Sequence, residues 1–350
     1  MTNKLRVGIV GCGGAVHQMH IPAFLRSKGV ILQAVCDKNE NLAKETASKY
    51  HIPGAYSSLS DMLAAGKLDI VDICVPPQIH APIAIEALQN GCHVLMEKPM
   101  ALNVLDCDQM IDAANKNGAK LCIIHNQLFN PAFLKARKLV AEGMIGDFTG
   151  MRIFLSDPRE EMIMREDYWI HKLPGGLIGE TGPHIVYMSL AFLNSVKSTD
   201  IYAKNFLEHP WAPFDEFRIE LEGEKAISSI AISYTGNHRD LYVDILGTEG
   251  VLHLDLCSML LIHYGRKVSA RPIPFAHYLL SVSSQIIGGV AANAFKLMTG
   301  KLRFGHDILI EEFADSILNN HQPPVTGEEG RETVKVMEMI VGRLREKYGV

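Results

Sequence analysis

Two short motifs place ionisable side chains where acid–base chemistry would need them. The first is Glu97-Lys98-Pro99, which directly follows the apolar stretch 93–96. A lone lysine after a strand is usually solvated, but at the carboxyl end of a parallel strand Lys98 would face a ligand crevice. Its ammonium group can donate a hydrogen bond to a substrate hydroxyl and stabilise the alkoxide. Pro99 fixes the local turn and is a candidate for a cis peptide bond.

The second motif is the segment 175–184, Gly-Gly-Leu-Ile-Gly-Glu-Thr-Gly-Pro-His, which precedes an apolar stretch. Pro183 is typical of the first helical position, so we expect a helix to begin there, capped by one of the two residues before it. His184 would then lie in the first turn, where the helix dipole keeps the ring available as a base. The Glu180 carboxylate would raise the pKa of His184 and so oppose the effect of the dipole. It could also orient the ring, as the carboxylate of a catalytic triad does. The alternative is a capped helix whose histidine only packs.

The elements that must position these motifs begin with a strand, a glycine turn and a helix. Residues 5–16 read Leu-Arg-Val-Gly-Ile-Val-Gly-Cys-Gly-Gly-Ala-Val, and a helical pattern runs from 15 to 25. Gly11 permits the turn, and Gly13 lets the backbone approach a pyrophosphate without a Cβ in the way. The helix N-terminus offers unpaired N–H groups to the phosphates. Val16 departs from the third small position of the Gly-x-Gly-x-x-Gly pattern, and a glycine turn alone is weak evidence.

Asp37 strengthens the prediction of dinucleotide binding. It ends the apolar stretch 30–36, where a carboxylate accepts hydrogen bonds from the adenosine ribose hydroxyls and repels a 2′-phosphate. We therefore predict NAD as the cofactor. NADP stays open as the alternative, because Lys38 could contact a phosphate.

A proline pair and a histidine follow another apolar stretch, 70–75, in the pattern Pro76-Pro77-x-x-His80. A cofactor lies at such strand ends in doubly wound sheets, whereas a simple loop stop is the alternative. The predicted cofactor-binding residues are Gly11, Cys12, Gly13, Gly14, Ala15, Val16, Asp37, Pro77, His80 and Glu97.

The first third of the sequence alternates strands and helices. Strands are expected at 30–36, 70–75, 93–96 and 120–124, and helices at 39–50, 79–89 and 104–117. Apolar strands separated by helices indicate a parallel sheet covered on both faces. We assign residues 1–124 to this α/β, doubly wound domain.

The pattern changes after about His125. A helix is expected over 131–142, and strands at 147–155, 214–220, 226–234, 241–246 and 251–256 follow one another with short turns. Such a meander predicts an antiparallel or mixed sheet in a second domain, which we assign to residues 125–350.

Composition narrows the class of protein. The 350 residues suggest about two domains, and 47% hydrophobic with 21% charged residues is ordinary for a globular enzyme. The formal charge of −5, with no basic stripe, argues against a nucleic-acid partner.

The seven cysteines lack Cys-x-x-Cys spacing, so we expect them to be reduced. The first strand begins within five residues of Met1, leaving no room for a signal peptide, so we expect a cytoplasmic location.

Residues 272–295 contain no Asp, Glu, Lys or Arg, so a membrane-spanning helix must be considered. The segment also contains His277, Gln285 and Asn293, which make it too polar for a comfortable span. We predict a buried or subunit-facing helix and no membrane partner.

Several polar and aromatic residues are candidate contacts for a hydroxylated ring, although Trp169 is equally compatible with a core position. They are His125, Asn126, Tyr168, Trp169, His171 and Lys172. His17 and His20 lie three residues apart and could suggest a metal. With no Asp, Glu or Cys cluster to complete a site, we predict none.

These motifs together resemble the Gfo/Idh/MocA oxidoreductase family. The resemblance rests on Gly-Cys-Gly-Gly-Ala, Pro-Pro-x-x-His, Glu-Lys-Pro, Gly-Gly…Glu-x-Gly-x-His and Gly247-Thr-Glu-Gly250, whose order and spacing cover about the whole chain. It implies an N-terminal Rossmann domain and a C-terminal α+β domain with a largely antiparallel open sheet that often mediates oligomerisation, here as a homodimer or homotetramer. It also implies NAD(P)-dependent oxidation or reduction of a sugar, cyclitol or related polyol. Lys98 would be the catalytic lysine and His184 the acid/base.

The sequence departs from the family pattern at three places. Glu180 stands where the family usually has Asp, the stretch 127–131 lacks the usual Arg, and Pro174 replaces a frequent third Gly. Two alternatives to a dehydrogenase therefore stay open: an NAD-assisted glycosidase, and a non-catalytic nucleotide-sensing protein.

Overall fold

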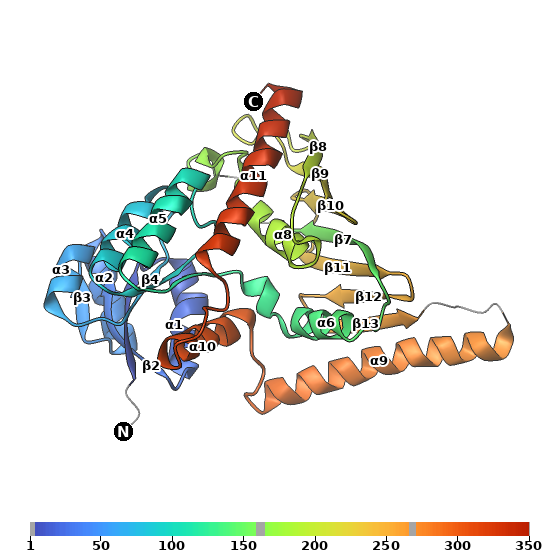
Figure 1. Cartoon of the computed structure of the whole chain (residues 1–350), viewed down its shortest axis with the longest axis horizontal. Coiled ribbons are helices and arrows are strands. Elements are labelled where there is room, and N and C mark those ends of the chain that lie inside the picture. Colours follow the sequence, from blue (N-terminus) through green and yellow to red (C-terminus); the bar gives the residue numbers. More distant parts are fainter. Residues whose placement is uncertain (1–3, 159–164, 266–270, 350) are drawn as a thin grey trace. The chain divides into compact units, whose positions relative to one another are not determined.

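The computed structural model describes residues 4–158, 165–265 and 271–349, which belong to two compact units (Figure 1). The first unit consists of Met1–Asn126 and Gly305–Lys335, and the second of Gln127–Phe304 and Val336–Val350. The first boundary lies two residues beyond the one we predicted. The return of Gly305–Lys335 to the first unit was not predicted, because nothing in that segment's local pattern indicates its partner.

The first unit is built on a six-stranded parallel sheet in the order β3-β2-β1-β4-β5-β6. Its strands are β1 (Leu5–Val10), β2 (Val30–Cys36), β3 (Gly54–Tyr56), β4 (Ile70–Ile73), β5 (His93–Met96) and β6 (Leu121–Ile123). Its helices are α1 (Ile21–Arg26), α2 (Glu40–Tyr50), α3 (Leu59–Ala65), α4 (His80–Gln89), α5 (Val104–Lys116), α10 (Gly305–Leu318) and the first part of α11 (Gly327–Tyr348). The strand order reverses between β1 and β4, and in such sheets ligands bind outside the carboxyl ends at the reversal.

The predicted doubly wound sheet is therefore confirmed. Side-chain hydrogen bonds and backbone conformation explain where the helices that flank it begin and end. The Asn39 side chain accepts a hydrogen bond from Leu42 N, and the Asn103 side chain accepts one from Asp106 N, so these residues cap α2 and α5. Gly118 follows α5 with φ of 61°, a conformation that favours glycine at a helix end. The short strand β3 was missed because its three residues, Gly-Ala-Tyr, do not form an apolar stretch and none of them is buried.

The second unit contains a seven-stranded sheet in the order β13-β12-β11-β7-β10-β9-β8. Its strands are β7 (Phe148–Ser156), β8 (Ser198–Lys204), β9 (Glu216–Glu222), β10 (Ile227–Ser233), β11 (Asp240–Gly247), β12 (Gly250–Asp255) and β13 (Leu260–Gly265). Its helices include α6 (Pro131–Ala141), α8 (Leu177–Leu193) and α9 (Pro272–Met298). Buried residues alternate with exposed or half-buried ones along β9 to β12, as expected for a sheet with one covered face.

The mixed, largely antiparallel character of this sheet was predicted correctly, but the simple meander is wrong. Strand β7 lies between β10 and β11, pairing parallel with β10 and antiparallel with β11. Sequence neighbours with short turns between them suggested direct pairing of β10 with β11. The pairing with β7, more than 70 residues earlier, leaves no local signal.

Helix α9 is the longest helix of the second unit and has no buried residue. It contacts β13, where Gln285 Oε1 accepts from His263 N at 2.8 Å and Gln285 Nε2 donates to His263 O at 3.2 Å. Of the two predicted alternatives, a helix buried within its own chain is therefore wrong, and the subunit-facing helix stays a prediction. By length and composition it is the one described helix that could cross a membrane.

Candidate active site

The glycine turn after β1 has the geometry that a dinucleotide needs. Gly11 has φ of 100°, and a Cβ there would collide with the Cys74 carbonyl oxygen. A Cβ on Gly13 would meet nothing within 4 Å, so the backbone at this position borders open space. Helical structure begins at Gly14, which leaves the first N–H groups of the helix without intrahelical partners. Val16 is fully buried, which explains how a larger residue is accepted at the third position.

Asp37 lies beside this turn, as predicted. Its Oδ2 accepts a hydrogen bond from Cys12 N, and its Oδ1 accepts one from Asn39 N, both at 2.9 Å. These bonds hold the carboxylate at the end of β2, while Lys38 is exposed. The turn and the carboxylate together fit the pyrophosphate and adenosine ribose of NAD.

The loops after β4 and β5 are joined by His80. Its Nε2 lies 2.9 Å from Val75 O and its Nδ1 lies 3.0 Å from Pro99 O, and the ring is fully buried. Burial lowers the pKa of His80, although the carbonyl contacts oppose the shift. Both ring nitrogens thus face backbone carbonyls, and the one that carries the proton donates to its carbonyl, so we assign His80 to positioning these loops rather than to direct cofactor contact. Pro77, also predicted as a contact, is buried at the start of a short 3₁₀ turn.

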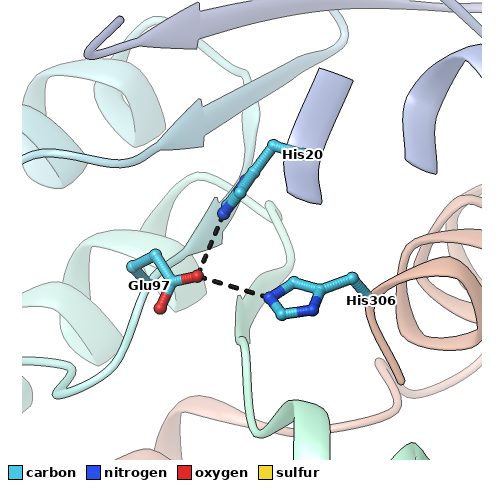
Figure 2. Close-up of side chains that lie close together, drawn as sticks. All are labelled: His20, Glu97 and His306. Carbon is cyan, nitrogen blue, oxygen red and sulfur yellow. Dashed lines mark hydrogen bonds and ion pairs between the residues drawn. The ribbon is translucent and has the colours of Figure 1, made fainter. Parts of the chain in front are cut away.

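Glu97 and Lys98 follow β5 at its carboxyl end, and the Lys98–Pro99 peptide bond is cis, as the sequence suggested. Glu97 Oε2 accepts a hydrogen bond from Lys98 N at 3.1 Å. The other oxygen, Oε1, faces two histidines: His20 Nε2 at 3.0 Å and His306 Nε2 at 3.6 Å (Figure 2).

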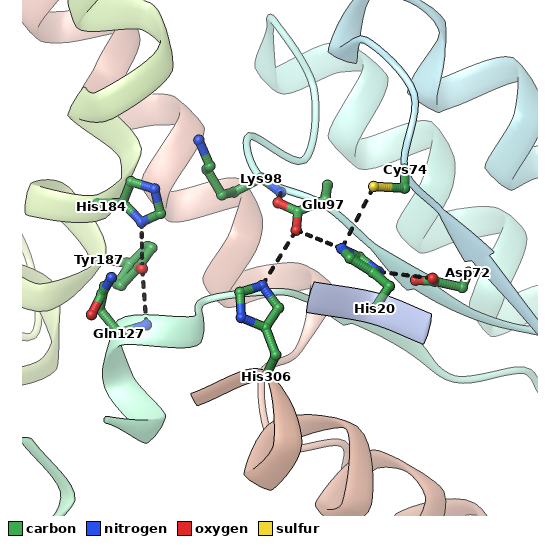
Figure 3. Close-up of polar contacts among 9 residues, drawn as sticks. All are labelled: His20, Asp72, Cys74, Glu97, Lys98, Gln127, His184, Tyr187 and His306. Atoms are coloured by element: carbon green, nitrogen blue, oxygen red, sulfur yellow. Dashed lines mark hydrogen bonds and ion pairs between the residues drawn. The ribbon is translucent and has the colours of Figure 1, made fainter. Parts of the chain in front are cut away.

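His20 is fixed from its other side by Asp72, a fully buried residue of β4. The distance from His20 Nδ1 to Asp72 Oδ2 is 2.8 Å, and Cys74 Sγ lies 3.5 Å from His20 Nε2 (Figure 3). Burial alone would lower the pKa of His20, but the Asp72 carboxylate, together with Cys74, outweighs it and raises that pKa well above its ordinary value. Burial would likewise raise the pKa of Glu97, yet bonds from His20 and His306 hold it well below its usual range.

His184 lies on α8 of the second unit, but not where we predicted it. The helix begins at Leu177 after the cap residue Gly176, and Pro183 lies inside it. His184 is therefore in the third turn, so the argument from the helix dipole is wrong for this residue and applies instead to Glu180 in the first turn. Glu180 and His184 keep the i, i+4 spacing that places both on one face of the helix.

Tyr187 is the partner of His184 Nδ1. Its hydroxyl lies 2.7 Å from that nitrogen and accepts a hydrogen bond from Gln127 N at 3.1 Å (Figure 3). We had assigned the orienting role to Glu180 and had not considered Tyr187. Its position three residues after His184 is the signal that a correctly extended helix would have supplied.

The predicted substrate contacts occupy different surroundings. His125 is only 2% exposed, and burial lowers its pKa to about 3, so it is a core residue of the first unit rather than an accessible contact. Asn126 begins a 3₁₀ turn and is half-buried. Trp169 and His171 share another 3₁₀ turn in the second unit. His171, with Lys172 and Arg345, lines a cavity of about 320 Å³, and among the described residues its buried ring nitrogens have no hydrogen-bond partner.

Three residues of these networks were not foreseen from the sequence. Asp72 could have been noticed, because it interrupts the apolar stretch 70–75 and a buried carboxylate needs a partner. His306 lies more than 200 residues from Glu97 in the chain and carries no local signal. Tyr187 was hidden by the misplaced helix start.

Comparisons with known proteins agree with this architecture. Residues 5–125 match the oxidoreductase family with the NAD-binding Rossmann fold, and residues 133–253 match the GFO/IDH/MocA C-terminal domain. The uncharacterized oxidoreductase YrbE of Bacillus subtilis is 25% identical over 347 residues, which are 96% of this chain and 93% of that protein.

Two other relatives match over shorter regions. D-glucoside 3-dehydrogenase of Escherichia coli is 32% identical over 146 residues, 42% of each chain. A glycosyl hydrolase family 109 protein of Shewanella baltica is 29% identical over 208 residues, 53% of this chain and 44% of its own. The chain therefore spans less than half the length of these two relatives.

Solved structures share the fold over nearly the whole chain. The WlbA dehydrogenase from Bordetella pertussis, in complex with NADH and UDP-GlcNAcA, has a TM-score of 0.78 at 22% identity and covers 99% of this chain and 98% of its own. The aldose-aldose oxidoreductase from Caulobacter crescentus, complexed with glycerol, has a TM-score of 0.79 at 20% identity with the same coverage. Since both of its domains match the family models, this chain belongs to the Gfo/Idh/MocA family of NAD-binding oxidoreductases.

Proposed function

We propose that this protein transfers a hydride between NAD and a CH–OH carbon of a sugar, cyclitol or related polyol. The observation that carries the proposal is the position of Lys98, directly after β5 at the carboxyl edge of the NAD-binding sheet. Similarity to a D-glucoside dehydrogenase supports a sugar-like substrate. Bound NAD supplies the hydride acceptor, and the remaining steps belong to side chains of this chain.

In this mechanism Lys98 donates a hydrogen bond to the substrate oxygen and stabilises it as negative charge develops. His184 accepts the hydroxyl proton through Nε2, because Tyr187 engages Nδ1. For Nε2 to accept, the neutral ring must carry its proton on Nδ1 and donate it to the Tyr187 oxygen. The turn from Gly11 to Ala15 and the Asp37 carboxylate hold the cofactor.

The test is a panel of polyols, sugars and glycosides, each mixed with NAD and followed at the NADH absorbance. Net NADH formation with a free polyol or sugar is the expected result. Turnover should be lost in Lys98→Ala, whereas the matched control Lys116→Ala, on the exposed face of α5, should keep it.

An NAD-assisted glycosidase is the second candidate, and the similarity to a glycosyl hydrolase family 109 protein supports it. Release of the aglycone without net NADH would establish this activity and overturn the dehydrogenase. Tight NADH binding with no turnover on any member of the panel would instead indicate a nucleotide-sensing protein.

We also propose that the protein forms a homo-oligomer and works in the cytoplasm. Support for the first comes from α9, whose apolar side chains Ile273, Leu280 and Ile287 are 67–73% exposed. Support for the second comes from the seven cysteines, all of which are free thiols. Light scattering should show an oligomer that Leu280→Glu/Ile287→Glu dissociates and Leu280→Met/Ile287→Met preserves. A monomeric wild type, or one that binds lipid vesicles through α9, would contradict the oligomer.

A further inference from the structure

Three side chains of the first unit converge on a single point with the donor set of a metal site. They are His20, which precedes α1, Glu97, which follows β5, and His306, in the first turn of α10. One ligand atom from each lies within 4.8 Å of the other two (Figure 2). We propose that these residues bind a divalent transition-metal ion, with zinc as the best fit.

Two of the three distances between ligand atoms are close to those around tetrahedral zinc, and the third, between the two histidines, is at most 4.8 Å. Bonds of about 2.0–2.2 Å from zinc to nitrogen and oxygen place neighbouring ligand atoms roughly 3.3 Å apart. Glu97 Oε1 lies 3.0 Å from His20 Nε2 and 3.6 Å from His306 Nε2, so a shift of a few tenths of an ångström brings both pairs to this value. A site of two histidines and one glutamate leaves a fourth position for another ligand.

Cys74 supplies a candidate for the fourth position. Its Sγ lies 3.5 Å from His20 Nε2, close to the separation of about 3.5 Å between sulfur and nitrogen around tetrahedral zinc. Binding as a thiolate would release the thiol proton to solvent.

The surroundings of His20 are those of a metal-bound imidazole. Its Nδ1 donates to Asp72 Oδ2 at 2.8 Å, and both side chains are fully buried. Such a carboxylate fixes the tautomer and directs the lone pair of the other nitrogen toward the metal. Here that lone pair would face the Glu97 oxygen, another acceptor, so a cation between them satisfies both. A proton on His20 Nε2 would also do so and is the competing explanation.

The donor types select the class of metal. Two imidazoles favour zinc and its neighbours over magnesium or calcium, which prefer all-oxygen sites. The ion would join three segments of the first unit that are distant in sequence, including the returning segment that begins at Gly305. It would also fix Glu97 next to Lys98, so we expect it to stabilise this unit and to hold the loop after β5 in place.

The test uses the full-length protein with its histidine tag removed. After dialysis against a chelator, zinc binding is measured by calorimetry, and the metal content of the untreated protein by elemental analysis. We expect one zinc per chain. His306→Gln should weaken binding at least about 100-fold, and Asp72→Asn by about 10- to 100-fold. His321→Gln is the matched control, because His321 also contacts a carboxylate, Asp315 at 2.9 Å, but is exposed.

Cobalt binding by the wild type provides a readout that does not depend on variant folding. A tetrahedral d–d absorption band is expected, with a sulfur charge-transfer band that Cys74→Ser removes if Cys74 is a ligand. Absence of stoichiometric zinc and of the tetrahedral cobalt band would overturn the proposal in favour of a protonated His20. Equal zinc binding by the wild type and folded His306→Gln would overturn it as well. NADH binding, measured separately by fluorescence, reports on the proposed function independently.

Discussion

The Nδ1 atom of His184 lies 2.7 Å from the hydroxyl oxygen of Tyr187, one turn further along the same helix. The Tyr187 oxygen also accepts a hydrogen bond from Gln127 N, which holds the hydroxyl in place. A neutral phenol therefore occupies the position that a carboxylate takes in a catalytic triad. It can fix the orientation of the ring while adding less stabilisation to the imidazolium than a carboxylate would.

Tyr187→Phe tests this role. If His184 is the base, kcat/KM for substrate oxidation rises with pH as the ring loses its proton. Loss of the Tyr187 acceptor should move that rising limb to lower pH and reduce kcat by about 10-fold, because the ring is less firmly held. A pH profile identical to that of the wild type would contradict the assignment.

Glu180→Gln is the companion variant, since it removes a negative charge one turn before His184 and keeps the side-chain shape. It should also move the limb to lower pH. His184→Asn should abolish the limb and reduce turnover by roughly 10²- to 10⁴-fold. If the limb persists in His184→Asn, another group accepts the proton.

Lys98→Ala should lower kcat by about 100-fold or more, the effect expected on loss of one electrostatic stabiliser worth roughly 2.7–4 kcal/mol. Lys98→Arg should also be impaired, because a planar guanidinium does not reproduce a compact ammonium. NADH affinity and thermal stability, measured on the same samples, should change little. Near-normal turnover of Lys98→Ala on the true substrate would place the active site elsewhere.

Asp37 should make NADH bind more tightly than NADPH. Its two carboxylate oxygens are held by Cys12 N and Asn39 N, so the negative charge is fixed at the end of β2 and opposes a 2′-phosphate. Fluorescence titration of both cofactors measures the preference, and Asp37→Ser should reduce it by at least about 10-fold. Tighter NADPH binding by the wild type would mean that Lys38 dominates.

Local signals predicted most of the first unit. Apolar stretches fixed the positions of the strands, and Asn39 and Gly118 mark helix ends through short-range hydrogen bonds and backbone conformation. The glycine turn was recognisable because Gly11 needs positive φ. Each of these features depends on residues close together in the sequence.

The features that could not be predicted depend on distant contacts. Pro183 favours a helix start, but α8 begins at Leu177, and Gly179 and Gly182 before the proline pack closely against Leu173 and Met337. His306 lies close to Glu97 although the strands of the second sheet separate the two residues in the sequence. A short stretch of the sequence does not show which distant residues it will contact in the fold.

The buried His125 should make the folded state sensitive to mild acid. Burial lowers its folded-state pKa to about 3 from an ordinary value of 6.5. Between these two values His125 is therefore protonated in the unfolded chain but neutral in the folded one. The stability associated with the neutral ring is thus fully present above pH 6.5 and is lost progressively toward pH 3. One such group contributes up to about 1.4 kcal/mol per pH unit, or about 2 kcal/mol between pH 6.5 and 5.

His125→Asn should destabilise the protein at pH 7.5 through lost packing, yet its free energy of unfolding in urea should fall less steeply with decreasing pH. The matched control is His51→Asn, an exposed histidine with φ of 56° that asparagine tolerates, and its pH dependence should follow the wild type. Parallel pH dependences for the wild type and His125→Asn would show that the His125 ring takes up its proton equally in the folded and unfolded states.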